Sequence, residues 1–105
     1  MFEIVERPTL PGEILLEEFM KPLGISRNSL AVHLGVSYSR INEIIQGRRA
    51  ITTDTAFRLA AYFDTTPEFW LNARNAVDMF DTLQDHKIDY QKIRRDSHVS
   101  QVAAI

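Results

Sequence analysis

The stretch SRNSLAVHLGVSYSRINEIIQG, residues 26–47, predicts two short helices joined by a tight turn. Ser26 and Ser37 each stand where a hydroxyl can cap a helix by accepting from a free backbone N–H of its first turn. Gly35, between them, supplies the positive φ that commonly ends a helix. Two helices around such a turn form a unit that can place its second helix in the major groove of DNA. An ordinary amphipathic helix pair is the alternative that the pattern leaves open.

Both predicted helices have one apolar face and one polar face. The residues predicted to point inward are Leu30, Ala31, Leu34, Ile41, Ile44 and Ile45. The second helix is left with an outward set that is polar and rich in hydrogen-bonding groups, as a surface that contacts base edges has to be. That outward set comprises Tyr38, Ser39, Arg40, Asn42, Glu43 and Gln46.

The length of 105 residues and a composition of 45% hydrophobic and 25% charged residues are typical of a single globular domain. Cysteine is absent, which excludes disulfides, thiolate metal sites and cysteine nucleophiles and suits a reducing compartment. No apolar run approaches the length of a transmembrane helix, and the acidic start does not resemble a signal peptide. We therefore expect a cytoplasmic protein that does not contact a membrane.

Charge is unevenly distributed along the chain, although the total is only −2. Residues 26–50 contain four bases and one acid, residues 1–25 two bases and five acids, and residues 51–105 six bases and eight acids. The positive block coincides with the predicted helix pair, which is where a DNA-binding surface would need it. Because this surface is small, we expect moderate affinity for one subunit and a dimer in the functional form.

Five helices with short connections are predicted, and strand signals are nearly absent, so the expected fold is all-α. The first helix should run from Pro11 to about Met20 and end before Pro22 and Gly24. Thr52 or Thr53 should cap the fourth helix. The sequence Thr66-Pro67-Glu68 should begin the fifth, which continues to about Gln84. The residues expected inside are Ile14, Leu15 and Phe19 on the first helix, Ala56, Leu59, Ala60 and Phe63 on the fourth, and Phe69, Trp70, Ala73, Val77 and Phe80 on the fifth, where core packing is favoured over an aromatic partner patch.

The end of the chain has mixed signals. Residues 87–95 could add one or two helical turns, and residues 97–105 could be disordered, a short strand or a partner-binding tail. We therefore divide the chain into a helix-turn-helix domain over residues 1–80 and a partly disordered extension over residues 81–105 for dimerisation or contact with a protein partner. The dimer contact is expected from residue 69 onward, because apolar residues exceed what one helix face needs. These surplus residues are Leu71, Met79, Leu83, Ile88, Tyr90 and Ile93.

Several of these segments together resemble a known family. Residues 26–70 resemble the XRE-type helix-turn-helix of Cro and phage repressors, and residues 8–80 more narrowly resemble the HigA-type antitoxins of bacterial addiction modules. The matching pieces are PGEILLEEF at 11–19 and INEIIQGRRAITTDTAFRLAAYFDTTPEFWLNAR at 41–74. The run EI-x-x-G-x-R-x-IT at 43–52, followed by TA-x-RLA and PEFWLN, is the specific signature. The chain departs from the pattern at Leu10, where a histidine is frequent, and after Asp81.

The resemblance implies a five-helix, lambda-repressor-like DNA-binding domain with a C-terminal helical extension. It implies a homodimer that binds an inverted-repeat operator in double-stranded DNA and represses its own operon. It also implies a protein partner, a HigB-type toxin that cleaves mRNA on the ribosome and is inactive in the complex. Solitary regulators of transcription with no toxin also belong to this group and are the alternative function.

Position in the matching motif implies the DNA contacts. Arg27 is expected at a phosphate or a base edge, and Ser37 at a phosphate. Arg40 is able to make a bidentate contact to guanine, and Tyr38 to pack on a thymine methyl or reach a phosphate. Glu43 is expected either to orient Arg40 or Arg48 by a salt bridge or to have a local structural role. The full predicted set of DNA-binding residues is Arg27, Ser37, Tyr38, Ser39, Arg40, Asn42, Gln46, Arg48 and Arg49.

Other kinds of chemistry find little support in the sequence. The three histidines, His33, His86 and His98, have no metal-binding spacing, so we predict no metal site. No nucleophile–base pair or phosphate loop is visible, so we predict that the protein is not an enzyme and needs no cofactor. A toxin-neutralising protein whose DNA contacts are vestigial is the alternative from the class of interaction proteins.

Overall fold

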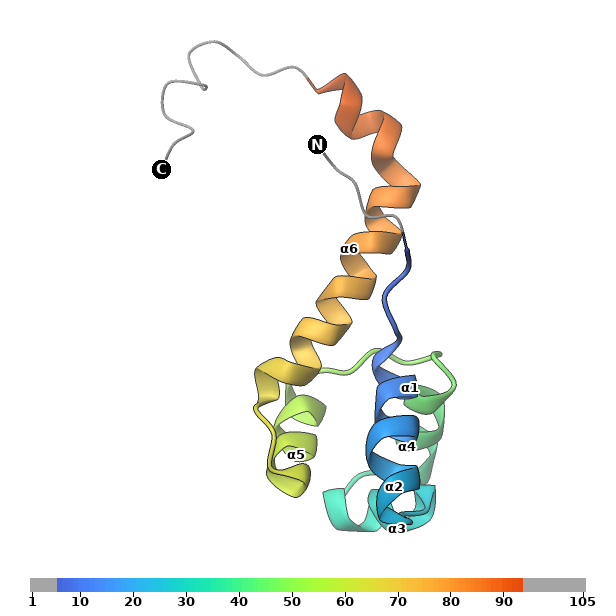
Figure 1. Cartoon of the computed structure of the whole chain (residues 1–105), viewed down its shortest axis with the longest axis vertical. Coiled ribbons are helices and arrows are strands. Elements are labelled where there is room, and N and C mark those ends of the chain that lie inside the picture. The colour runs from blue at the N-terminus through green and yellow to red at the C-terminus, as the bar shows by residue number, and fades with distance from the viewer. Residues whose placement is uncertain (1–5, 94–105) are drawn as a thin grey trace.

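The computed structural model describes residues 6–93, which form a small helical bundle and one long helix that extends beyond it (Figure 1). Its elements are α1 (Pro11–Ile14), η1 (Leu15–Met20), α2 (Lys21–Leu23), α3 (Arg27–Leu34), α4 (Tyr38–Ile45), α5 (Thr53–Phe63) and α6 (Pro67–Lys92). Because α1, η1 and α2 follow one another without a break, they form one helix. The predicted all-α fold is confirmed, and residues 6–93 contain no strand.

The first helix differs from the prediction at its C-terminal end. It continues through Pro22 to Leu23 and ends at Gly24, where φ is 65°. A proline ring would normally clash with the carbonyl four residues earlier in an α-helix. Here η1 adopts the wider π form, in which the N–H of Lys21 bonds to the carbonyl of Leu16, five residues back. We attribute the passage of the helix through Pro22 to this widened segment.

The helix caps predicted from the sequence are confirmed. The hydroxyls of Ser26, Ser37 and Thr66 each accept from the backbone N–H three residues later, at 3.0, 3.1 and 3.1 Å. Thr52, not Thr53, caps α5, accepting from the N–H of Thr55 at 3.2 Å. These bonds satisfy N–H groups that the first turns would leave unpaired, and thereby fix where α3, α4, α5 and α6 begin.

The core lies where α1–η1, α3, α4, α5 and the start of α6 meet. Leu30, Ala31 and Leu34 of α3 are buried, as predicted, and so are Ile41 and Ile44 of α4. The other buried residues of this cluster are Leu15, Met20, Ile51, Ala56, Leu59 and Trp70. Four residues predicted to be inside, Ile14, Phe19, Ile45 and Phe63, are half-buried and pack against its edge.

The prediction that Phe69 is buried was wrong, since the side chain is 42% exposed. Trp70 occupies the inward position of α6, is fully buried, and donates from Nε1 to Thr65 Oγ1 at 2.9 Å. Phe69 lies one residue earlier, about 100° around the helix, and therefore points past the edge of the core. Ala73 and Phe80 are half-buried, whereas Val77 is buried, as predicted. Leu83, which was predicted to belong to the dimer contact, is also buried, at 6% exposure.

The helix α6 has 26 residues and continues past Gln84, the predicted end, to Lys92. It passes without interruption through residue 81, where the sequence pattern had suggested a division of the chain. Arg7, on the segment before α1, binds Asp81 through both carboxylate oxygens at 3.0 and 2.9 Å and lowers the pKa of Asp81. The predictions for residues 94–105 lie outside the described residues. No helix within residues 6–93 combines the length and apolar character needed to cross a membrane.

The backbones of α1 and α4 touch at Gly12, which is buried. A Cβ atom at this position would overlap the carbonyl oxygen of Ile44 and lie 2.8 Å from its carbonyl carbon. It would also lie 2.9 Å from the Cα of Ile45. Since these are backbone atoms, no side-chain rotation could relieve the overlap. The glycine therefore sets how closely the first helix approaches the C-terminal end of α4.

We expect Gly12→Ala to lower the free energy of unfolding by about 3 kcal/mol, because α1 must move away from α4. In an unobstructed helix the same substitution stabilises by roughly 0.5–1 kcal/mol, so the sign of the change tests the contact. Urea denaturation would measure it. Gly24→Ala is the control: Gly24 has φ +65°, and a Cβ added there would have no atom within 4 Å. It should cost only about 1–2 kcal/mol of backbone strain. A Gly12→Ala protein as stable as the unsubstituted one would contradict the close approach.

Candidate nucleic-acid interface

The N-terminal turn of α4 is presented to solvent because the rest of the helix is held from behind. Ile41 and Ile44 are buried against α3 and α1, which leaves the first turn exposed. Ser37 and Ser39 are exposed, and the side chain of Tyr38 is 49% exposed. Free backbone N–H groups and hydroxyls at a helix N-terminus favour a phosphate. The geometry thus suits α4 as a recognition helix that approaches DNA with its N-terminal end.

Arg27 and Asn42 meet across the two helices of the pair. The Nη1 of Arg27, at the start of α3, donates to the Oδ1 of Asn42, in the middle of α4. Both residues are half-buried, so the pair sits between the helices and not on an open surface. The contact holds the amide of Asn42 in one orientation, with its nitrogen as the remaining donor.

Arg40 is held by a carboxylate from the next helix. Its Nη1 lies 3.4 Å from Oδ2 of Asp54, and the same oxygen accepts from Nε of Arg58 at 2.9 Å. Arg58 also donates from Nη1 to the carbonyl of Leu34 at 2.8 Å, at the C-terminal end of α3. The hydrogen bond from Arg58, with a smaller contribution from Arg40, lowers the pKa of Asp54. The long Arg40–Asp54 contact is the weakest link of this network and the one that DNA could replace.

Glu43 binds Arg49 and neither Arg40 nor Arg48, which fits the alternative prediction of a local structural role. Its Oε1 accepts from Nε and Nη2 of Arg49, each at 2.8 Å. The pairing arises because the chain turns back after α4 at Gly47, where φ is 74°, and brings residue 49 beside residue 43. The guanidinium of Arg48 is exposed and has no hydrogen-bond or ion-pair partner within residues 6–93.

The loop that bears Arg48 and Arg49 is attached to α6. Arg74 donates from Nη1 to the carbonyl of Ile51 at 3.1 Å and from Nε to Asp78 at 3.3 Å. Sequence reasoning missed Asp54, Arg58 and Arg74, which position the predicted contacts from other helices. A basic residue within the family signature, such as Arg58 in TA-x-RLA, was the only sequence signal for them.

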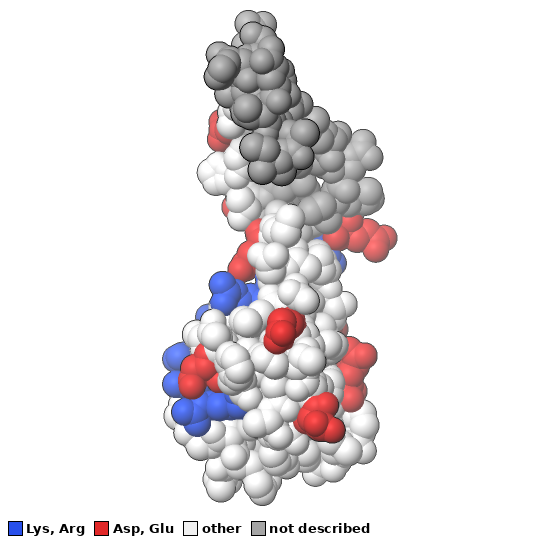
Figure 2. Space-filling model, turned by 90° about the vertical axis from the view of Figure 1, so that its left-hand side faces the viewer, with Lys and Arg blue, Asp and Glu red and all other residues white. Residues whose placement is uncertain are grey.

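The predicted site residues therefore divide into exposed residues, Arg48 among them, and residues held by another side chain. Ser37, Tyr38 and Ser39 stand together at the exposed start of α4, and Gln46 is exposed at its far end. Arg27, Arg40, Asn42 and Arg49 are each held by another side chain. In Figure 2 the basic side chains gather along one edge of the molecule with acidic ones among them, while much of the face toward the viewer is uncharged.

Comparisons with known proteins identify the family. The helix-turn-helix family model matches residues 16–70. The chain is 51% identical over 81 residues to virulence-associated protein I of Dichelobacter nodosus, covering 76% of this chain and 75% of that protein. It is 44% identical over 81 residues to the HTH-type transcriptional regulator YbaQ of Escherichia coli K12, covering 77% and 72%. It is 43% identical over 76 residues to antitoxin HigA-1 of Vibrio cholerae, covering 72% and 71%.

A solved structure of antitoxin GraA in complex with its operator superimposes on this chain with a TM-score of 0.82 at 40% identity. The match covers 91% of this chain and 98% of the GraA chain. The protein therefore belongs to the helix-turn-helix family, and its predicted membership of the HigA-type antitoxins is confirmed.

We predict that Arg40→Ala costs about 1–3 kcal/mol on the cognate operator and relaxes the preference at one base position. The reason is that Arg40 is the long bidentate donor near the exposed turn of α4. Competition titrations against operators with single base changes would measure the effect. Equal losses on cognate and random DNA would reduce Arg40 to a phosphate contact.

The two loop arginines should act differently from Arg40. Replacing Arg48 and Arg49 together by alanine should weaken binding similarly on all sequences. It should also reduce the slope of log K against log salt by roughly one for each phosphate that is no longer neutralised. Titrations at several salt concentrations would test this. Lys92→Ala, at the far end of α6, is the control and should leave the slope unchanged. An unaltered slope in the double variant would remove the loop from the interface.

Proposed function

We propose that the protein is an antitoxin that binds its own operator as a homodimer, represses its operon and neutralises a HigB-type mRNA endonuclease toxin. The single observation that supports it most is the exposed first turn of α4, with Arg40 held beside it. The likeness to an antitoxin that was solved with its operator supports the same conclusion. The proposal assigns the protein no catalytic step and no cofactor.

In this proposal the DNA contacts come from α3, α4 and the loop after α4. Ser37 contacts a phosphate through its hydroxyl and nearby N–H groups, and Arg48 and Arg49 contact phosphates on the other side of the groove. Arg40 leaves Asp54 and reaches a base edge. The remaining contacts are those of Arg27, Tyr38, Ser39, Asn42 and Gln46. The carboxylates that Arg40 and Arg49 would leave are exposed to solvent, so the exchange costs little.

The dimer is proposed to form along α6. Beyond the bundle this helix exposes Met79 and Ile88, at 55 and 66%, and Ile93, directly after its last residue, is 73% exposed. Exposed apolar side chains that recur along one helix usually mark an interface. Two copies related by a two-fold axis would place their recognition helices about 34 Å apart, the spacing of half-sites one helical turn apart. An inverted-repeat operator would then be bound symmetrically.

A solitary regulator of transcription without a toxin is the second candidate. It is favoured by the 44% identity to YbaQ, which is named as a regulator and not as an antitoxin. The two candidates share the operator and differ only in the protein partner.

A mobility-shift assay on the DNA upstream of the gene tests operator binding, which both candidates require. Co-expression with the product of the adjoining reading frame tests the antitoxin, since rescue of growth requires a toxin there. Operator binding without such a toxin would favour the regulator.

Met79→Asp should convert the protein to monomers at micromolar concentration, because a charge would be buried at the proposed α6 interface. The monomer itself should remain folded, since Met79 is 55% exposed. Sedimentation velocity would measure the oligomeric state. Val32→Asp, which places the same charge on a residue of α3 that is 72% exposed, is the matched control. A Met79→Asp protein that remains dimeric would move the interface away from this part of α6.

A further inference from the structure

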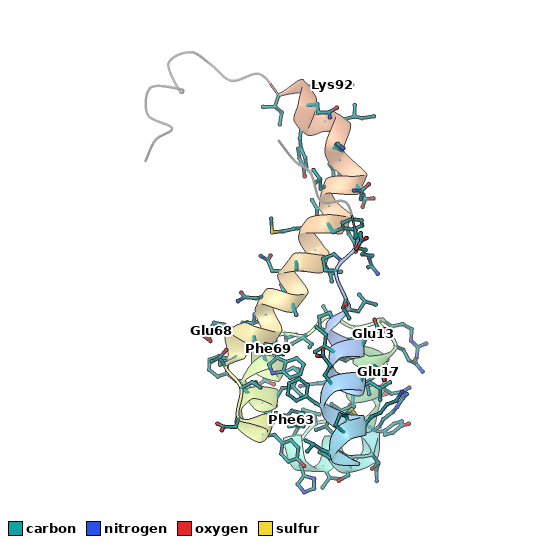
Figure 3. The ribbon with its side chains drawn as sticks, viewed as in Figure 1. Glu13, Glu17, Phe63, Glu68, Phe69 and Lys92 are labelled. Carbon is teal, nitrogen blue, oxygen red and sulfur yellow. The ribbon has the colours of Figure 1, made fainter. Side chains whose placement is uncertain are left out.

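A continuous set of aromatic rings joins η1, α5 and the start of α6, and Figure 3 labels two of them, Phe63 and Phe69. Phe19 of η1 contacts Phe63 of α5 at 5.0 Å between ring centroids and Phe69 of α6 at 5.9 Å. Phe63 contacts Tyr62 at 4.9 Å, and buried Trp70 lies beneath Phe69 at 5.0 Å. Of these rings, Phe69 and Tyr62 are the most exposed, at 42 and 37%.

Acidic residues accompany these rings in the chain, and Figure 3 shows Glu68 beside Phe69 at the start of α6. Three of the rings have an acid as a direct neighbour in the chain: Glu18 beside Phe19, Asp64 beside Phe63, and Glu68 beside Phe69. Figure 3 also labels Glu13 and Glu17, which lie on the first helix.

Most of these acids have no cation of their own. Within residues 6–93, the carboxylates of Glu13, Glu18, Asp64 and Glu68 have no hydrogen-bond or ion-pair partner. Only Glu17 is paired, with Lys21 at 2.7 Å. The aromatic surface therefore has uncompensated negative charge around it, which the bundle alone does not use.

We propose that this surface, formed by Phe19, Tyr62, Phe63 and Phe69 with Asp64 and Glu68, binds an arginine- or lysine-rich face of the toxin. The proposal rests on the antitoxin function proposed above. An arginine side chain suits it on two grounds: its guanidinium can stack on the exposed ring of Phe69, and its charge can pair with Glu68 or Asp64. An apolar side chain beside the arginine would cover the rest of the ring surface.

The negative charge of the surface argues against two other occupants, DNA and a second copy of this chain. DNA would bring phosphates against unpaired carboxylates, which repel them. A second copy of this chain, placed on the surface by a two-fold axis, would bring acids against acids. A basic protein has the complementary charge, and electrostatic attraction would speed its association.

The surface also lies apart from the DNA contacts. Asp54, which holds Arg40, and Phe63 are at opposite ends of α5, about 14 Å apart by helical rise. The toxin could thus bind while the first turn of α4 remains open to DNA. A complex of operator, this protein and toxin is expected to form.

The test uses the full chain and, as the probe, the purified product of the reading frame that adjoins its gene. Phe69→Ala should weaken binding of that protein roughly 10- to 100-fold, because the exposed ring is the anchor. Asp64→Asn with Glu68→Gln should slow association and reduce its dependence on salt, with the rings left in place. Asparagine is tolerated at position 64, where φ is 58°.

Phe57→Ala is the matched control for Phe69→Ala. Phe57, on α5, is likewise an exposed phenylalanine, at 59%, but it has no ring contact within residues 6–93. This substitution should leave toxin affinity unchanged. Operator affinity, measured by mobility shift, should stay within about twofold for every variant, since none replaces a DNA contact. If the unsubstituted protein does not bind the operator at all, the proposed function itself is refuted.

The docking surface alone would be refuted by three results. They are an unchanged toxin affinity for Phe69→Ala, a dimer that dissociates in that variant, and an adjoining product that binds but is not basic. An adjoining product that does not bind at all would refute the antitoxin function proposed above. If Phe69→Ala loses its cooperative unfolding transition, the Asp64→Asn and Glu68→Gln double variant decides. In that case normal association and salt dependence would overturn the proposal.

Discussion

The contact between the backbone of Gly12 and the carbonyl of Ile44 is the constraint on which the arrangement of the bundle depends. With no side chain at position 12, the first helix can lie directly against the C-terminal end of α4. This brings Leu15 and Met20 into the core, where Ile41 and Ile44 meet them, and so determines which side of α4 is buried. Because that side of α4 is buried, its N-terminal turn is left exposed. The glycine of the matching piece PGEILLEEF is thus explained by packing against α4.

Electrostatic pairing within the chain explains how a protein of net charge −2 can present arginines to DNA. Arg40 and Arg49 are each beside a carboxylate, which limits the positive field and orders the side chains. Exposed pairs of this kind contribute little to stability, so a phosphate or base can displace the carboxylate at low cost. Asp54 has a lowered pKa and stays ionised well below neutral pH, so Arg40 keeps its partner in the free protein.

Local features of the fold were predictable from the sequence, whereas contacts between distant segments were not. The caps at Ser26, Ser37 and Thr66 depend on neighbouring residues, and helical spacing was enough to identify the inward isoleucines of α4. The π segment before Pro22 could not be foreseen, because it is a compromise between the proline ring and the packing of the whole helix. The pairing of Glu43 with Arg49 was not among the expected salt bridges, since the path of the loop after Gly47 decides the partner of Glu43. The residues assigned to DNA contact remain predictions.

The exposure of Phe69 shows where periodicity stops being informative. Spacing places an aromatic residue on a helix face, but whether that face is covered depends on how far the helix follows the bundle. Trp70 is fully buried at the start of α6, and Phe69, about 100° around the helix from it, is already exposed there. The exposed surface of α6 is available to partners. A domain this small can bind DNA, a second copy and a basic protein at the same time only if each partner binds a separate face. The positions of α4, outer α6 and the aromatic surface meet that requirement.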